Sequence, residues 1–154
     1  MMALAMTNRE LIEIKSVPTE GMGCLSFFEA THDIPFEIKR IYYIYDVPEG
    51  IERGGHAHRK LSQLLVCTYG SIEILLDDGS ERRTVLLDDP AKGLLVEGFV
   101  WREMRWLVEG SVLMVAASEY YDESDYIRDR AAFDQEVAVC RSEAVSYTHL
   151  TLPT

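Results

Sequence analysis

The chain has 154 residues, which is the length of one domain, and 47% of them are hydrophobic. Ten Gly and five Pro are too few for a low-complexity chain, so wholesale disorder is excluded. The formal net charge is −11, from 15 Lys and Arg against 26 Asp and Glu. Because such a field repels phosphate backbones, no nucleic-acid partner is expected, and any anionic ligand has to meet locally clustered cations.

The cysteines and the N-terminus indicate the compartment. Cys24, Cys67 and Cys140 are widely spaced, so neither a disulfide framework nor a zinc knuckle is indicated. Residues 1–6 are mildly apolar but lack a basic region, and no run approaches the roughly 18 apolar residues of a membrane span. We expect a soluble, cytoplasmic protein with no signal peptide and no membrane partner.

Short apolar runs separated by turn residues predict an all-β barrel or sandwich. The expected strands are residues 11–17, 24–30, 39–46, 61–69, 71–76, 81–87, 93–96, 100–107 and 112–118. Gly79, in the sequence Asp-Asp-Gly-Ser, indicates a tight hairpin, because glycine supplies the positive φ that such turns require. This number of strands in this length favours a jelly roll.

The composition changes after residue 118. Residues 126–138 place apolar side chains at roughly helical intervals, which predicts one short C-terminal helix with Ser124 or Asp125 as its N-cap. Residues 146–154 have neither apolar periodicity nor charged side chains. We therefore expect a domain at residues 8–140 and, at residues 141–154, a tail that is disordered or foreign to the domain.

The densest group of chemically useful side chains lies at residues 53–60, Arg-Gly-Gly-His-Ala-His-Arg-Lys. His56 and His58 are two apart in an extended segment, so both side chains point to the same face and can act on one ligand. Histidine suits proton transfer or metal binding near neutral pH. The alternative is two solvent-facing histidines on an edge strand.

The spacing of His56, His58, Gln63 and Gly70 resembles the first motif of the cupin superfamily, which has Glu at the position of Gln63. In the second cupin motif Trp101 stands where metal-binding cupins carry a histidine. Without the anionic ligand and one imidazole, no metal cofactor is expected. The two histidines are then available as acid and base.

A closer resemblance is to the sugar 3,4-ketoisomerases that act on dTDP-4-keto-6-deoxyglucose. It rests on five ordered blocks, residues 41–48, 53–61, 75–79, 100–104 and 117–128. The resemblance implies an RmlC-like cupin jelly-roll barrel, a homodimer with an exchanged N-terminal strand, and a thymidine nucleotide at the barrel mouth. It also implies that the paired histidines lie beside the keto sugar.

The implied reaction gives a dTDP-3-keto-6-deoxyhexose through an enediol, feeds the synthesis of 3-amino-3,6-dideoxy sugars, and needs no cofactor. His56 is expected to be the base at carbon and His58 to handle the oxygen proton, although the sequence leaves open which does which. The Tyr42 hydroxyl is a candidate donor to the enediolate oxygen, with core packing as the alternative.

Three further residues are expected to bind the substrate. Arg53 and Arg102 suit the diphosphate or sugar, because a guanidinium fork matches phosphate oxygens. Trp101 is expected to stack on thymine or the sugar, with a buried core position as its alternative. Family members carry His or Arg at the position of Arg102, which bears on the C4 epimer formed, and the gluco product is favoured.

Three rival functions stay open at this point. A dTDP-sugar 3,5-epimerase is also a cofactor-free jelly roll, but it exchanges the C5 proton. The others are a non-catalytic sugar-nucleotide-binding cupin and a metal cupin with altered ligands.

Overall fold

The computed structural model describes the backbone of residues 9–151 and the side chains of residues 11–143. Its strands are β1 (Arg9–Glu13), β2 (Lys15–Thr19), β3 (Gly23–Phe27), β4 (Arg40–Ile44), β5 (Glu52–His58), β6 (Gln63–Tyr69), β7 (Ile72–Asp77), β8 (Arg82–Leu87), β9 (Lys92–Val96), β10 (Trp101–Trp106), β11 (Val112–Ala117) and β12 (Tyr126–Ile127). A short 3-10 helix, η1 (Glu123–Asp125), precedes β12, and the helix α2 (Arg130–Thr151) follows it.

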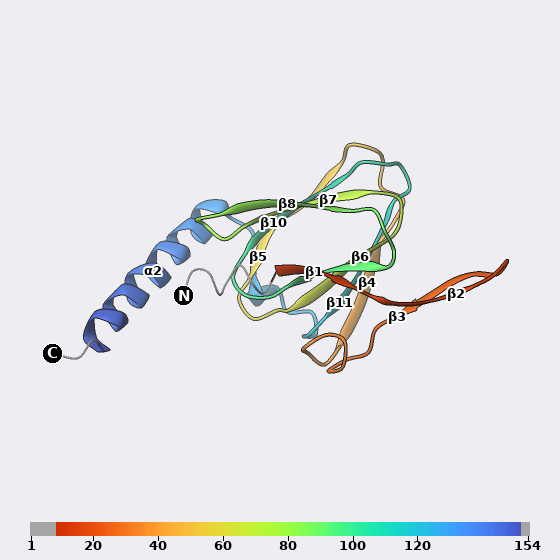
Figure 1. Cartoon of the computed structure of the whole chain (residues 1–154). Helices are drawn as coiled ribbons and strands as arrows, with labels where there is room; N and C mark the ends of the chain where they lie inside the picture. Colours follow the sequence, from red (N-terminus) through yellow and green to blue (C-terminus); the bar gives the residue numbers. More distant parts are fainter. Residues whose placement is uncertain (1–8, 152–154) are drawn as a thin grey trace.

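Two five-stranded antiparallel sheets form the barrel (Figure 1). The first has the strand order β1-β9-β6-β11-β4 and the second has the order β12-β5-β10-β7-β8. Alternate side chains of both sheets meet in one buried core, to which Leu65, Leu113, Ile74 and Trp106 belong. The predicted jelly roll is confirmed, as is the hairpin between β7 and β8.

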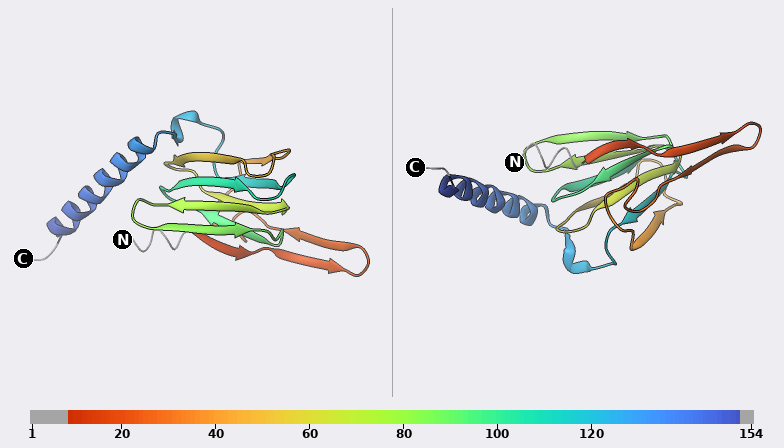
Figure 2. Two further views of the ribbon diagram at one scale, coloured as in Figure 1. Left: turned by 90° about the horizontal axis from the view of Figure 1, so that it is seen from above. Right: turned by 60° about the horizontal axis from the view of Figure 1, so that its bottom comes forward.

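The β2–β3 hairpin stands apart from the barrel. Figures 1 and 2 show it projecting from the end of the molecule opposite to α2. Every residue of β2 is exposed, and so are the apolar side chains of Val17, Leu25 and Phe27. The hairpin therefore buries little of its apolar surface within its own chain.

The helix differs from the expected one in both position and length. It begins at Arg130 instead of near residue 126, because residues 123–127 form η1 and then pair with β5 as β12. Asp122 caps η1, so neither Ser124 nor Asp125 is the N-cap of the long helix. The backbone stays helical through Thr151, so the tail expected at residues 141–154 is helical as far as it is described. No Gly or Pro occurs between Arg130 and Pro153, so nothing in this part of the sequence interrupts a helix. The lack of apolar periodicity in the last residues means that a helix there has no apolar face, and it does not exclude a helix.

Most of strand β5 lies where the sequence predicts a loop. Gly54 and Gly55 have φ of 89° and 72°, and β5 shifts register against β10 between Arg102 and Glu103. Such an irregularity needs residues without a side-chain penalty at positive φ, and those glycines resemble a turn in the sequence. The glycines of this β-bulge are therefore the reason that the sequence does not predict the start of the strand that carries the two histidines.

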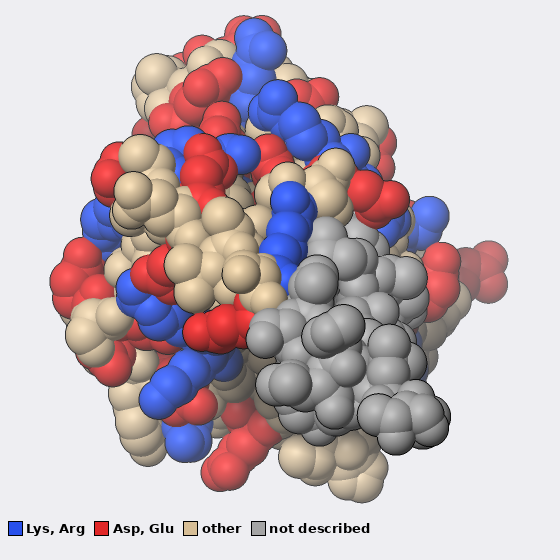
Figure 3. Space-filling view, turned by 90° about the vertical axis from the view of Figure 1, so that its left-hand side faces the viewer, with Lys and Arg blue, Asp and Glu red and all other residues tan. Residues whose placement is uncertain are grey.

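Charges are interspersed on the face drawn in Figure 3, where Lys and Arg lie among Asp and Glu. The negative net charge is therefore not gathered into one patch on the visible part of that face. Within residues 9–151, no helix combines the length and the apolar character that crossing a membrane requires.

Candidate active site

His56 and His58 lie side by side on the inner face of β5, as their spacing predicts. Their ring centroids are 4.9 Å apart in an edge-to-face arrangement. Ala57 between them points to the other face, where it packs under α2. His58 is buried, with 1% of its surface exposed, whereas His56 is half-buried and borders a cavity. The alternative of two solvent-facing histidines is therefore excluded.

A buried arginine lies behind the histidines. Arg102 on β10 pairs with His56 across the sheet and is 1% exposed. Its guanidinium donates hydrogen bonds to the side-chain oxygen of Gln63 and, at 3.3 Å, to the carbonyl oxygen of Val100. A fixed positive charge thus stands next to both imidazoles.

Gln63 connects this arginine to Tyr42. The amide nitrogen of Gln63 donates to the Tyr42 hydroxyl at 2.9 Å, so the hydroxyl keeps its own proton for another acceptor. Burial raises the pKa of Tyr42, which keeps the phenol protonated. Tyr42 also packs against the core, whereas its neighbours Tyr43 and Tyr45 are exposed. The Tyr42 ring therefore packs against the core, while its role as a donor to the enediolate oxygen stays a prediction.

Both histidines are neutral at neutral pH. Burial lowers the pKa of His56 to about 4, and the charge of Arg102 adds to this effect. Burial, then Arg102 and then His56, lower the pKa of His58 to about 2. A neutral imidazole has one nitrogen free to accept a proton, so the pair is prepared to act as bases.

Tyr126 closes the cluster, although the sequence predicts no role for it. Residue 126 pairs with His58 through β12, and its ring centroid lies 4.2 Å from that of His58 and 5.2 Å from that of His56. The Arg128 guanidinium lies over the Tyr126 ring at 4.3 Å and is ion-paired with Glu123 at 2.7 Å. The only sequence signal is that these residues fall within the block 117–128.

Two cavities of about 480 Å³ each border this cluster. One contains His56 and Tyr42 in its wall, together with Arg53 and Arg128. The other reaches His58 and Lys60, and Arg40, another residue without an expected role, lines both cavities. Three arginines therefore line the cavity beside His56, as a binding site for an anion requires.

Trp101 is not at either cavity. It precedes Arg102 on β10 and so points to the opposite face of the sheet, where it is 5% exposed. Its ring centroid lies 5.7 Å from that of Phe133 in α2, and its indole N–H donates to Glu103 Oε2 at 2.9 Å. The structure thus places Trp101 in the core cluster beneath α2 rather than beside a ligand.

The donor set does not fit a cupin metal site. Gln63 uses its oxygen to accept from Arg102, whose positive charge would also oppose a cation there. Among the residues that the structure describes, no three His, Cys, Asp or Glu side chains are grouped as metal ligands.

Comparisons with known proteins agree with this geometry. The profile of the FdtA family, described as WxcM-like, C-terminal, matches residues 7–138. The TDP-4-oxo-6-deoxy-α-D-glucose-3,4-oxoisomerase of Aneurinibacillus thermoaerophilus is 45% identical over 131 residues, which cover 85% of this chain and 94% of that protein.

Solved structures give the same result. QdtA, a sugar 3,4-ketoisomerase from Thermoanaerobacterium thermosaccharolyticum in complex with TDP, is 46% identical with a TM-score of 0.81, covering 85% of this chain and 95% of its own. A histidine-to-asparagine variant of QdtA in complex with TDP-4-keto-6-deoxyglucose has 45% identity and a TM-score of 0.81, covering 84% and 94%. The rmlC epimerase of Mycobacterium tuberculosis, 17% identical with a TM-score of 0.68 and covering 77% and 67%, shares the RmlC-like fold. The chain therefore belongs to the FdtA family.

Proposed function

We propose that this chain is an isomerase that converts dTDP-4-keto-6-deoxyglucose to a dTDP-3-keto-6-deoxyhexose through an enediol. The observation that carries this proposal is the neutral His56–His58 pair beside the buried Arg102 charge, with Tyr42 in the wall of the cavity that His56 borders. The family and the named activities of its relatives support the same reaction.

The reaction needs a base at carbon. The C3–H bond breaks, its proton goes to an imidazole, and its electron pair forms the C3=C4 bond while the C4 oxygen takes negative charge. His56 suits this step because it is half-buried at a cavity that also holds Tyr42, whereas His58, which lines the other cavity, is only 1% exposed. We assign the C3 proton to His56 and the transfer of the oxygen proton to His58.

The enediolate needs stabilisation in a site shielded from water. The Tyr42 phenol donates a hydrogen bond toward the C4 oxygen, and the buried Arg102 guanidinium supplies a fixed positive charge. His58 then moves the proton of the C3 hydroxyl to the C4 oxygen, the C3–O bond becomes the ketone, and the electron pair of the C3=C4 bond takes the proton held by His56 onto C4. The sugar gains and loses the same number of protons and electrons, so no redox cofactor takes part.

Arginines bind the rest of the substrate in this proposal. Arg53 lines the cavity that holds His56, and Arg40 and Arg128 extend the positive lining around it. A diphosphate accepts hydrogen bonds from guanidinium groups at such positions. The site thereby attracts an anion within a chain of net charge −11.

We also propose that the protein is a cytoplasmic homodimer that works in the biosynthesis of 3-amino-3,6-dideoxy sugars. The exposed apolar side chains of the β2–β3 hairpin support exchange of this hairpin with a second copy. Light scattering on the purified protein is expected to give twice the chain mass of 17.5 kDa, and a monomer would contradict the exchange.

Proton NMR of the purified protein with dTDP-4-keto-6-deoxyglucose tests the proposed reaction. We expect a new 3-keto sugar whose large H4–H5 coupling identifies the gluco epimer. A small coupling would show the galacto epimer instead. The protein used in this assay should first be shown to bind TDP to saturation. If the sugar spectrum then stays unchanged, the result would contradict catalysis and favour a binding protein.

A further inference from the structure

The side chain of His58 is almost completely buried, yet neither ring nitrogen makes a hydrogen bond within the described part of the chain. A buried polar atom without a partner is costly unless a ligand or a reaction uses it. The carboxylate of Asp125 is close to one of the two nitrogens, with Oδ2 3.5 Å from Nδ1 of His58.

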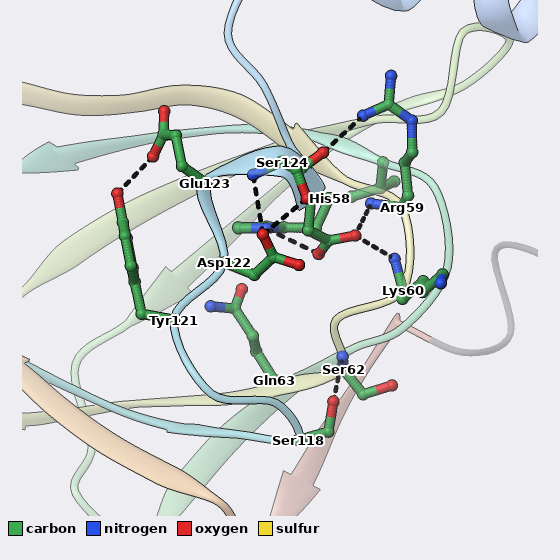
Figure 4. A network of polar contacts seen from close by, with 12 residues as sticks. His58, Arg59, Lys60, Ser62, Gln63, Ser118, Tyr121, Asp122, Glu123 and Ser124 are labelled. Carbon is green, nitrogen blue, oxygen red and sulfur yellow. Dashed lines mark hydrogen bonds and ion pairs between the residues drawn. The ribbon is translucent and has the colours of Figure 1, made fainter.

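Backbone groups at the end of β5 hold this carboxylate in place. Its other oxygen, Oδ1, accepts from the backbone N–H groups of Arg59 at 3.1 Å and Lys60 at 2.9 Å. The Arg59 side chain donates to the carbonyl oxygen of Ser124 at 3.3 Å, which fastens η1 to the same segment. Figure 4 shows His58, Arg59 and Lys60 beside the turn that contains Ser124. One carboxylate oxygen thus fixes the loop while the other faces the imidazole.

Both positively and negatively charged groups surround the His58 ring. The titratable and charged groups around its ring are His56, Tyr126, Arg102, Arg40, Arg128 and Asp125. The arginines oppose protonation of the ring, and burial opposes it further. Asp125 supplies the negative charge in this set, and an ionised carboxylate only accepts hydrogen bonds.

We propose that Asp125 is a positioning residue that holds neutral His58 in the tautomer with its proton on Nδ1. The Nε2 lone pair of His58 is then available to take the substrate's oxygen proton and to return it. This role rests on the proposed function, because it gives His58 the oxygen-proton step of the isomerisation. A carboxylate that orients a catalytic histidine and stabilises its protonated form acts by the same physics in other enzymes.

The tautomer can be measured without substrate. In protein labelled with ¹⁵N-histidine at neutral pH, two-bond ¹H–¹⁵N spectra distinguish Nδ1–H from Nε2–H imidazoles. We expect the His58 signals of the wild-type protein to show Nδ1–H, and those of Asp125→Asn to shift toward Nε2–H. A wild-type His58 with its proton on Nε2 would overturn the proposal whether or not the protein is an isomerase.

Kinetic measurements distinguish orientation of His58 by Asp125 from mere support of the loop by the same residue. The amide introduced by Asp125→Asn keeps an oxygen for the Arg59 and Lys60 N–H groups, so the melting temperature of this variant should change little. We expect kcat to fall about 100-fold with KM nearly unchanged, within the range that general acid–base catalysis contributes. Asp129→Asn makes the same chemical change at an exposed position before α2 and should keep the wild-type kcat.

Each alternative has its own outcome. If Asp125 only supports the loop, Asp125→Asn keeps kcat and only Asp125→Ala loses stability and activity, which overturns the proposal. If Asp125→Asn does not fold, the wild-type tautomer still decides. If the wild-type protein does not turn over the sugar but His58 carries its proton on Nδ1, the proposed function fails while the orientation by Asp125 stands.

Discussion

The guanidinium of Arg102 donates a hydrogen bond to the side-chain oxygen of Gln63, at the position where metal-binding cupins carry a glutamate. The same glutamine donates to the Tyr42 hydroxyl, so an uncharged side chain joins a buried cation to a phenol. Because Gln63 is neutral, it binds Arg102 without adding a negative charge beside it.

Replacing Gln63 by Glu tests this arrangement. A carboxylate would neutralise Arg102, raise the pKa of both histidines and remove the amide donor to Tyr42. We expect kcat to fall at least about tenfold while the protein stays folded, since the buried pair keeps its hydrogen bond. Steady-state kinetics and thermal unfolding measure both effects, and a Gln63→Glu enzyme with the wild-type kcat would show that the neutral charge is unimportant.

The hydroxyl of Tyr42 is expected to act in the transition state. Loss of one donor to a developing oxyanion lowers kcat by roughly 100- to 1,000-fold, so Tyr42→Phe should lose about that much. Its stability should change by only about 1 kcal/mol, the worth of one hydrogen bond. Tyr43→Phe removes a hydroxyl from the exposed outer face, where Tyr43 is 64% exposed, and should behave as the wild type. Equal kcat values for the two variants would leave Tyr42 with core packing alone.

The depressed pKa of His56 sets the acid limit of activity. The base is neutral above its folded pKa of about 4, so kcat/KM should stay level from neutral pH downward and fall only near pH 4. A descent centred near pH 6.5, the ordinary histidine value, would contradict the buried, arginine-flanked environment.

Stability should depend on pH through the same groups. Between pH 6.5 and 4 the unfolded chain protonates His56 and His58 while the folded protein does not, so the unfolded state binds more protons. The free energy of unfolding should therefore decrease as the pH falls below about 6.5. In urea titrations the His56→Asn variant should show a weaker pH dependence, and an unchanged slope would contradict this linkage.

Trp101 is expected to affect stability more than substrate binding. Its ring is buried in one core cluster with Ala57 and Phe133, so Trp101→Ala should destabilise the protein by about 3–5 kcal/mol. Trp101→Phe keeps an aromatic ring there and should be milder. KM of Trp101→Phe should remain close to the wild-type value. A large rise in KM without loss of stability would instead support the stacking contact expected from the sequence.

The sequence predicts much of this site because side chains along a strand point alternately to its two faces. The two-residue spacing of His56 and His58 places both rings on one face, and the structure confirms it. The same rule shows why Trp101 and Arg102, which are adjacent on β10, do not both face the interior. An alternating pattern read through β10 leaves only Arg102 on the face that carries the histidines.

Other parts of the site depend on long-range contacts. Asp125 and Tyr126 reach β5 from the far end of the chain, and Arg40 reaches the cavities from β4. The local periodicity of the sequence carries no information about such long-range neighbours. The first part of strand β5 also escapes sequence-based prediction, because its positive-φ glycines have the composition of a turn.

The most direct test follows deuterium from solvent into the sugar. Wild-type protein with dTDP-4-keto-6-deoxyglucose in D₂O should place deuterium at C4 of the 3-keto product and at C3 of recovered substrate, and leave C5 untouched. His56→Asn should show none of this exchange and still bind TDP. Deuterium at C5, or full exchange at C3 in the His56→Asn variant, would contradict a 3,4-ketoisomerase that uses His56 as its carbon base.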